Sequence, residues 1–313
     1  MTNLSADDCK TIGDDLRTKL KILSGTIWQA RANSPQIDSW LANFTGEVVA
    51  TDTERTYALY LLTRLMYYGQ REIRALLRAL YRDLFRYPIL SEIRRANGDT
   101  KDSVLLNNLF EQELQATRFV GLGDVATSGP MLLYELRLAT ELRDDVFTTL
   151  DAILAGKASD VPPAVKRYVF IDDLCATGDQ ATGYSRDLVE PIRSRYGSSV
   201  ELLYFVMFAT AEALGNLMPP ATNFDRVRAV HVLDESFKSF GPNSRYFPAA
   251  DGKLDLATGK ATATRYGAKL SGSPLGYGNC QLLLAFQYNT PDNTLPIIWS
   301  KVGSWTPIFE RRS

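Results

Sequence analysis

The 313-residue chain contains a single histidine, His231, and only three cysteines. A zinc site built on several histidines is therefore excluded, and a catalytic set that pairs a nucleophile with histidine could use only this residue. It lies in VRAVHVLDE, where it alternates with apolar residues, so we expect a packed or half-exposed strand residue. The cysteines Cys9, Cys175 and Cys280 are far apart and match no metal-ligand spacing, which fits a reducing cytoplasm.

The sequence also lacks long apolar runs and a strong net charge. No run of about 18 apolar residues occurs, so we expect no membrane-spanning helix. The first residues, MTNLSADDCKTIGDDLR, are acidic and polar and do not resemble a signal peptide. The net charge of −1 does not mark the whole protein as a binder of polyanions. We therefore expect a cytoplasmic protein with no membrane partner.

The pattern of apolar residues predicts three regions. Residues 1–115 show helical spacing, with helices expected over 16–28, 51–68, 70–87 and 103–115. Residues 116–235 alternate helices with strands, the strands expected at 118–123, 168–171, 200–208 and 227–233. This alternation predicts an α/β core, a parallel sheet with helices on both faces. Residues 236–313 contain many turns around a strand at 281–288, and we expect an irregular C-terminal hood packed on the core.

The most informative pattern begins at Tyr168, in YVFIDDLCATGDQATGYS. Four apolar residues lead into two adjacent carboxylates, Asp172 and Asp173, and a loop of small residues then opens a helix. Carboxylates at the end of a buried strand can accept hydrogen bonds from vicinal hydroxyls. The N–H groups of the loop and of the helix N-terminus can contact a phosphate. The pattern therefore indicates a sugar-phosphate site.

This segment resembles the ribose-phosphate-binding signature of type I phosphoribosyltransferases. The resemblance implies that Asp172 and Asp173 are the reaction-centre residues and lie against the ribose hydroxyls of phosphoribosyl pyrophosphate. It implies that the 5′-phosphate is held by Ala176, Thr177, Gly178, Asp179, Gln180 and Ala181. Mg²⁺ would arrive with the ligand, with Asp172 and Asp173 as its candidate protein ligands. Such chemistry at the anomeric carbon relies on electrostatic support and needs no histidine.

A second turn, residues 121–130, has the position and form of the pyrophosphate loop of that family. It follows the first core strand and precedes a helix, and its glycines would let the backbone approach an anion. The residues expected to contact the ligand are Gly123, Thr127, Ser128 and Gly129. The alternative is that these glycines only shape the turn, without a ligand.

Two features depart from the family pattern. Asp179 and Gln180 stand where the family carries small and hydroxyl-bearing residues. The interval 137–166 looks helical, whereas familiar members carry a two-stranded flap there that excludes water. Three interpretations therefore stay open: an effector that transfers or cleaves at the anomeric carbon, a catalytically silent nucleotide sensor or scaffold, and a nucleotide-salvage enzyme.

Five arginines recur at three- to four-residue spacing, namely Arg71, Arg74, Arg78, Arg82 and Arg86. At 100° per residue they fall on one face of a helix, opposite its apolar residues. Such a stripe suits contact with a phosphate backbone or with a nucleoprotein. Pairing with nearby acids is the simpler alternative.

Over roughly residues 40–310 the chain is similar to phosphoribosyltransferase-like proteins of bacterial conflict and antiphage operons. The similarity rests on FVGLG…ATSGP from Phe119, on the Asp172–Asp173 loop, and on NTPDNTLP…W from Asn289. It implies a toxin effector in antiphage defence, of a kind encoded beside retron reverse transcriptases. The partners would then be a reverse transcriptase and its RNA–DNA product, and self-association into a homo-oligomer is a further expectation.

Overall fold

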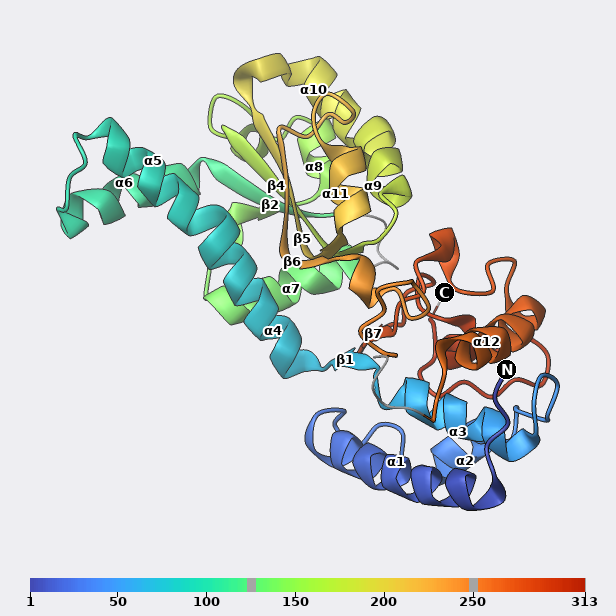
Figure 1. The fold of residues 1–313 in the computed structure, drawn as a ribbon. Helices are drawn as coiled ribbons and strands as arrows, with labels where there is room; N and C mark the ends of the chain where they lie inside the picture. Colours follow the sequence, from blue (N-terminus) through green and yellow to red (C-terminus); the bar gives the residue numbers. More distant parts are fainter. Residues whose placement is uncertain (123–127, 248–252, 313) are drawn as a thin grey trace. The chain divides into compact units, whose positions relative to one another are not determined.

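The computed structural model describes residues 1–122, 128–247 and 253–312, and the chain forms two compact units (Figure 1). One unit comprises Met1–Arg71 with Asp234–Ser313, and the other comprises Glu72–Leu233. These boundaries differ from the predicted ranges 1–115, 116–235 and 236–313. The helices between residues 72 and 115 pack with the sheet, and the C-terminal segment packs with the N-terminal helices.

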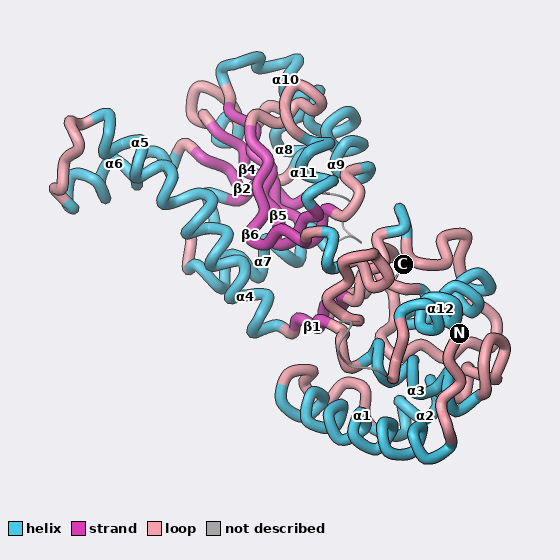
Figure 2. The backbone as a smooth tube through the Cα atoms, in the orientation of Figure 1, coloured by secondary structure: helices cyan, strands magenta, loops and turns pink. Residues whose placement is uncertain are grey.

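The unit of residues 72–233 is built on a five-stranded sheet in which every pairing is parallel (Figure 2). Its strands, in spatial order, are β3 (Phe147–Thr148), β2 (Thr117–Gly121), β4 (Arg167–Cys175), β5 (Glu201–Thr210) and β6 (Arg226–Leu233). The apolar runs of β4 and β5 form the centre and are almost entirely buried. The predicted α/β fold class with a parallel sheet is confirmed.

Helices cover both faces of this sheet. On one face, Phe170 and Tyr204 belong to a core that includes side chains of four helical segments. These are α8 (Leu150–Leu154), α9 (Asp179–Tyr184), α10 (Glu190–Tyr196) and α11 (Ala211–Leu217). On the other face, Phe119 packs edge-on against Phe85, with ring centroids 5.1 Å apart. The single histidine, His231, lies on the edge strand β6, where its exposed ring stacks on Phe208 as a strand residue.

The helix predicted to stop at Pro88 continues past it. Helix α4 (Gln70–Ala79) runs into a π-helical segment, η1 (Leu80–Arg86), and then into α5 (Tyr87–Ala96). Pro88 lies in the first turn of α5, where a missing N–H is tolerated, and the wider π-helical turn precedes it. The predicted stop was therefore wrong.

The two longer helices that remain in this unit are α6 and α7. Helix α6 (Ser103–Gln115) has the predicted bounds, because Asp102 accepts hydrogen bonds from Val104 and Leu105 N–H as its N-cap. Helix α7 spans Ser128–Thr140. Residues 137–166 are all described, and their one strand is the two-residue β3, so this interval contains no two-stranded flap. The other short segments are η2 (Asp144–Val146), η3 (Ala158–Asp160), η4 (Ser185–Val189) and η5 (Gly197–Ser199).

The other unit is mainly helical and packs around Trp28, Trp40, Phe44 and Tyr266. Its elements are α1 (Ala6–Thr26), α2 (Ser34–Leu41), α3 (Thr51–Leu62), β1 (Met66–Tyr68), η6 (Glu235–Phe237), α12 (Leu256–Leu270), η7 (Tyr277–Asn279), β7 (Leu284–Phe286) and α13 (Pro296–Trp299). The predicted helix 51–68 was wrong beyond Leu62. Residues 66–68 instead pair in parallel with β7, a tertiary contact that local spacing cannot reveal. Among the described helices, none is long and apolar enough to cross a membrane.

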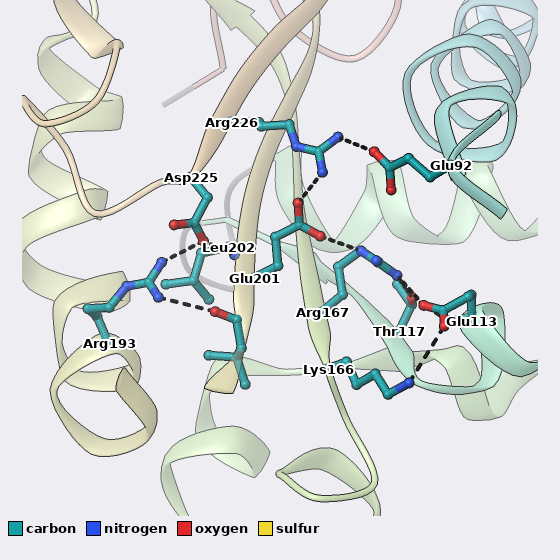
Figure 3. A network of polar contacts seen from close by, with 11 residues as sticks. Glu92, Glu113, Thr117, Lys166, Arg167, Arg193, Glu201, Leu202, Asp225 and Arg226 are labelled. Atoms are coloured by element: carbon teal, nitrogen blue, oxygen red, sulfur yellow. Dashed lines mark hydrogen bonds and ion pairs between the residues drawn. The ribbon is translucent and has the colours of Figure 1, made fainter. Parts of the chain in front are cut away.

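Charged side chains gather where β4, β5 and β6 begin (Figure 3). Glu201 accepts from Arg167 Nε at 2.7 Å and from Arg226 Nη2 at 2.5 Å. The two arginines also reach Glu113 of α6 and Glu92 of α5, each at 3.3 Å. One carboxylate thus joins three strands, and its partners tie two helices to this edge of the sheet.

Removing that carboxylate should destabilise the protein strongly. In Glu201→Ala, Arg167 and Arg226 would lose the carboxylate that they share at a partly buried edge and would keep only Glu113 and Glu92, each at 3.3 Å. We expect the free energy of unfolding to fall by about 2–4 kcal/mol in urea denaturation. The matched control is Asp187→Ala, which breaks the exposed pair with Arg186 and should cost at most about 0.5 kcal/mol. Equal losses in the two variants would contradict this account.

Candidate sugar-phosphate site

The parallel sheet brings the predicted ligand-binding segments to one edge. The carboxyl ends of parallel strands lie together, and ligands of open α/β sheets bind there. Gly121, at the end of β2, pairs with Ile171, so it lies beside Asp172 and Asp173. The loop 176–178 follows directly on β4. Ser128 and Gly129 open α7, whereas the predicted residues Gly123 and Thr127 lie outside the described residues.

The two acids belong to strand β4 itself rather than to the turn after it. The strand was expected to end at Ile171, but its pairing with β5 continues through Asp172 opposite Val206 and Cys175 opposite Ala209. The ladder to β5 thus pairs Asp172 directly and holds Asp173 between two paired residues, Asp172 and Leu174. Rigid placement of this kind is what a binding site requires of the groups that orient its ligand.

Asp172 is a buried carboxyl with a well-defined set of partners. Its side chain accepts from the Tyr204 hydroxyl at 2.9 Å and from Asp173 N–H at 2.9 Å, and the residue is 7% exposed. Burial raises the pKa of Asp172, and the neighbouring charge of Asp173 raises it further. Burial and the Asp172 charge likewise raise the pKa of Tyr204. The site therefore holds an acid that keeps its proton to a higher pH than an ordinary aspartate.

The loop after β4 is anchored by the end of β5. The Thr210 hydroxyl donates to the Ala176 carbonyl at 2.7 Å and accepts from Ala213 N–H at 3.0 Å, so it also caps α11. Gly178 has a φ of 89°, a left-handed conformation that favours glycine. The Thr177 hydroxyl accepts from Asp179 N–H at 3.2 Å. The loop geometry is thus set by contacts within the protein.

The last three predicted loop residues differ in their surroundings. Asp179 and Gln180 are exposed, and the Gln180 amide donates to the Tyr184 hydroxyl at 2.6 Å within α9. Ala181 is buried in the core on the α9 face of the sheet. The small residue at position 181 is accordingly explained by packing, while the side chains at 179 and 180 lie on the surface.

Two glycines of the second turn are required by a close backbone approach. A β-carbon on Gly121 would lie 2.6 Å from backbone atoms of Gly129, and one on Gly129 would lie 2.2 Å from the Leu122 carbonyl oxygen. No side chain fits at either position, because the end of β2 touches the start of α7. This contact accounts for both glycines without a ligand, which was the alternative interpretation of the turn.

Sequence reasoning missed the residues that support the acids. Tyr204 lies within the apolar run of β5, and only its position opposite Phe170 shows that it can reach Asp172. Burial and the Asp172 charge raise the pKa of Cys175 to about 12, so this thiol is no candidate nucleophile. In the part of the chain that the structure describes, no three His, Cys, Asp or Glu side chains are grouped to hold a metal ion.

The arginine stripe does not form one continuous free surface. Arg74 pairs with Glu135 of α7 at 2.6 Å, and Arg82 pairs with the adjacent Asp83 at 2.7 Å. The guanidinium of Arg86 lies 5.2 Å from the centre of the Phe110 ring. The remaining two members, Arg71 and Arg78, are exposed. The expected role of the stripe in binding nucleic acid stays a prediction.

A parallel sheet with adjacent carboxylates and an anchored loop at its carboxyl edge defines a phosphoribosyltransferase-like α/β protein. The model of the PRTase-CE family matches residues 37–311, and the chain belongs to this family. Searches of curated proteins and of solved structures each found no match.

The buried carboxyl should make stability depend on pH. Unfolded aspartates titrate near 3.8, whereas folded Asp172 keeps its proton to higher pH. As pH rises between these two pKa values, the unfolded chain loses this proton first, so the free energy of unfolding falls. Asp172→Asn cannot ionise. We therefore expect it to be more stable than the parent protein by about 1–3 kcal/mol near pH 8, with little difference near pH 4.

Thermal unfolding without added ligand, measured at a series of pH values, checks this expectation. The control Asp187→Asn removes an exposed carboxylate of the same unit. Its stability should still fall with rising pH as that of the parent protein does, because Asp172 is unchanged. A pH dependence in Asp172→Asn equal to that of the parent protein would show that this carboxyl does not carry the effect.

Proposed function

We propose that this protein binds phosphoribosyl pyrophosphate, or a related nucleotide, at the carboxyl edge of its sheet. The observation that carries the proposal is the buried Asp172, held by the Tyr204 hydroxyl beside Asp173 and next to the 176–181 loop. A carboxyl kept out of water at some cost in stability is typical of a functional site. Membership of a phosphoribosyltransferase-like family supports the same ligand class.

The two acids would orient the ribose through its vicinal hydroxyls. Each carboxylate oxygen can accept a hydrogen bond, and Tyr204 keeps the Asp172 group in one position. The backbone N–H groups of residues 176–181 would contact the 5′-phosphate. In a transfer or cleavage reaction, the negative charge of Asp173, beside an Asp172 that keeps its proton to higher pH, would support the positive charge that develops at the anomeric carbon.

The same pair of acids fits Mg²⁺. Mg²⁺ is commonly bound through one or two carboxylates together with phosphates of the substrate. The repulsion between Asp172 and Asp173, which contributes to the raised pKa of Asp172, is what a cation would relieve. When bound, Mg²⁺ would neutralise the pyrophosphate group. Asp172 and Asp173 would hold it together with that group.

Calorimetric titration with phosphoribosyl pyrophosphate and Mg²⁺ tests the proposal. We expect Asp172→Asn and Asp173→Asn each to raise the Kd by about tenfold or more, which corresponds to about 1.4 kcal/mol. Asp187→Asn, an exposed change outside the edge, should leave the Kd unchanged. Titrations with nucleotides and NAD identify a related ligand. If none of these compounds binds, or if binding survives in both site variants, the proposal is wrong.

Turnover separates the candidate functions that share this site. The absence of a two-stranded flap between residues 137 and 166 favours a catalytically silent sensor, because a flap normally excludes water during transfer. Binding without consumption of the ligand would support the sensor. Release of pyrophosphate or ribose phosphate would support an enzyme, and turnover with a simple base would support nucleotide salvage.

We further propose that the protein acts in the cytoplasm as the toxin of an antiphage system, as its resemblance to conflict-system proteins suggests. A reverse transcriptase and its RNA–DNA product would regulate it. Induced expression in a bacterial host should then slow growth, and the double variant Asp172→Asn/Asp173→Asn should restore it, while Asp187→Asn should not. Growth that is unaffected by the parent protein, with and without phage infection, would exclude this role.

A further inference from the structure

A groove between α5 and α6 is a feature that the proposed function does not use. Figure 1 shows the two helices side by side at one end of their unit. The groove has a volume of about 360 Å³. Its lining combines apolar, polar and basic side chains, namely Tyr87, Leu90, Leu106, Ser91, Ser103, Asn107, Arg86 and Arg94. None of these eight lining residues is acidic.

Each helix turns one regular face toward the groove. On α5 the lining residues follow the spacing i, i+3, i+4, i+7, beginning at Tyr87 and ending at Arg94. On α6 they follow i, i+3, i+4, beginning at Ser103. Residues at these spacings share one side of a helix. A third helix can fill such a groove, with its ridges of side chains between those of α5 and α6.

One large apolar side chain of the groove lining is strongly exposed. Tyr87 is 50% exposed. Val104 and Leu105 are also exposed, but they do not line the groove and lie on other sides of α6. An exposed tyrosine beside the partly buried Leu90 and Leu106 is typical of a surface that a partner covers.

The two arginines determine which partner fits. Arg86 contacts the Asn107 side chain at 3.4 Å and the Phe110 ring rather than a carboxylate. Arg94 pairs with Asp99 at 3.2 Å, but both side chains are more than half exposed, so a carboxylate of a partner can replace Asp99 at little cost. The two arginines are eight positions apart in the sequence, which is about 12 Å along a helix, or about two turns.

We propose that this groove binds an acidic amphipathic helix of a partner protein. The apolar face of that helix would pack on Tyr87, Leu90 and Leu106. Carboxylates about two turns apart on its flank would pair with Arg86 and Arg94. The apolar lining favours this occupant over a nucleic acid, whose backbone would contact the arginines but would leave Leu90 and Leu106 uncovered.

A fluorescently labelled synthetic peptide tests the proposal with the full-length protein. The probe is a helix of about 18 residues with leucines on one face and glutamates about two turns apart beside them. We expect fluorescence anisotropy to show binding that Arg86→Glu/Arg94→Glu weakens by about tenfold or more. Tyr87→Ser, a change at a half-exposed position, should also weaken it. Arg95→Glu is the matched control, because Arg95 is on α5 but does not line the groove.

Two further probes decide between occupants. One is a scrambled peptide of the same composition, and the other is a labelled single-stranded DNA of about 20 nucleotides. Binding of the ordered peptide alone, lost in the groove variants and kept in Arg95→Glu, supports the proposal. Equal binding of the scrambled peptide, an equal loss in Arg95→Glu, or binding of DNA in place of the acidic helix would overturn it.

Discussion

In a parallel sheet that is covered on both faces, the middle of the central strands is buried and charged groups gather where these strands begin and end, and this constraint organises the sheet-containing unit. At the edge where the strands begin, Glu201 joins Arg167 and Arg226 and ties helices to the sheet. At the edge where the strands end, Asp172 remains protonated to unusually high pH beside Asp173. The first edge stabilises the fold, whereas the buried carboxyl at the second edge lowers stability as pH rises above the ordinary pKa of an aspartate.

Much of this architecture follows from local sequence patterns. Alternating apolar strands and helices gave the correct fold class, and helical spacing gave the bounds of α6, which Asp102 caps in the structure. The errors arose where tertiary contacts override local preference. Residues 66–68 form a strand only because β7 is available to pair with them. Pro88 stays within a long helix because a π-helical segment precedes it, a feature without a sequence signal here.

The residue types of the candidate site could be predicted from the sequence, but the burial and the hydrogen-bond partners of these residues could not. Adjacent carboxylates before a small-residue loop can be recognised in a sequence, whereas the Tyr204 hydroxyl that holds Asp172 lies in a neighbouring strand and cannot. Likewise, Gly121 and Gly129 were noticed as glycines, but their mutual contact depends on how β2 meets α7. The arginine stripe was visible, while the pairing of Arg74 with Glu135 was not.

The hydroxyl of Thr210 has a consequence for the thermodynamics of any ligand that binds the neighbouring loop. The Thr210 hydroxyl hydrogen-bonds the Ala176 carbonyl and also caps α11. The loop is therefore held in one conformation by the end of β5 and by the start of α11. Ordering a loop upon binding reduces affinity through lost conformational entropy. Here that entropy is lost when the chain folds, so a ligand would meet donors that are already in place.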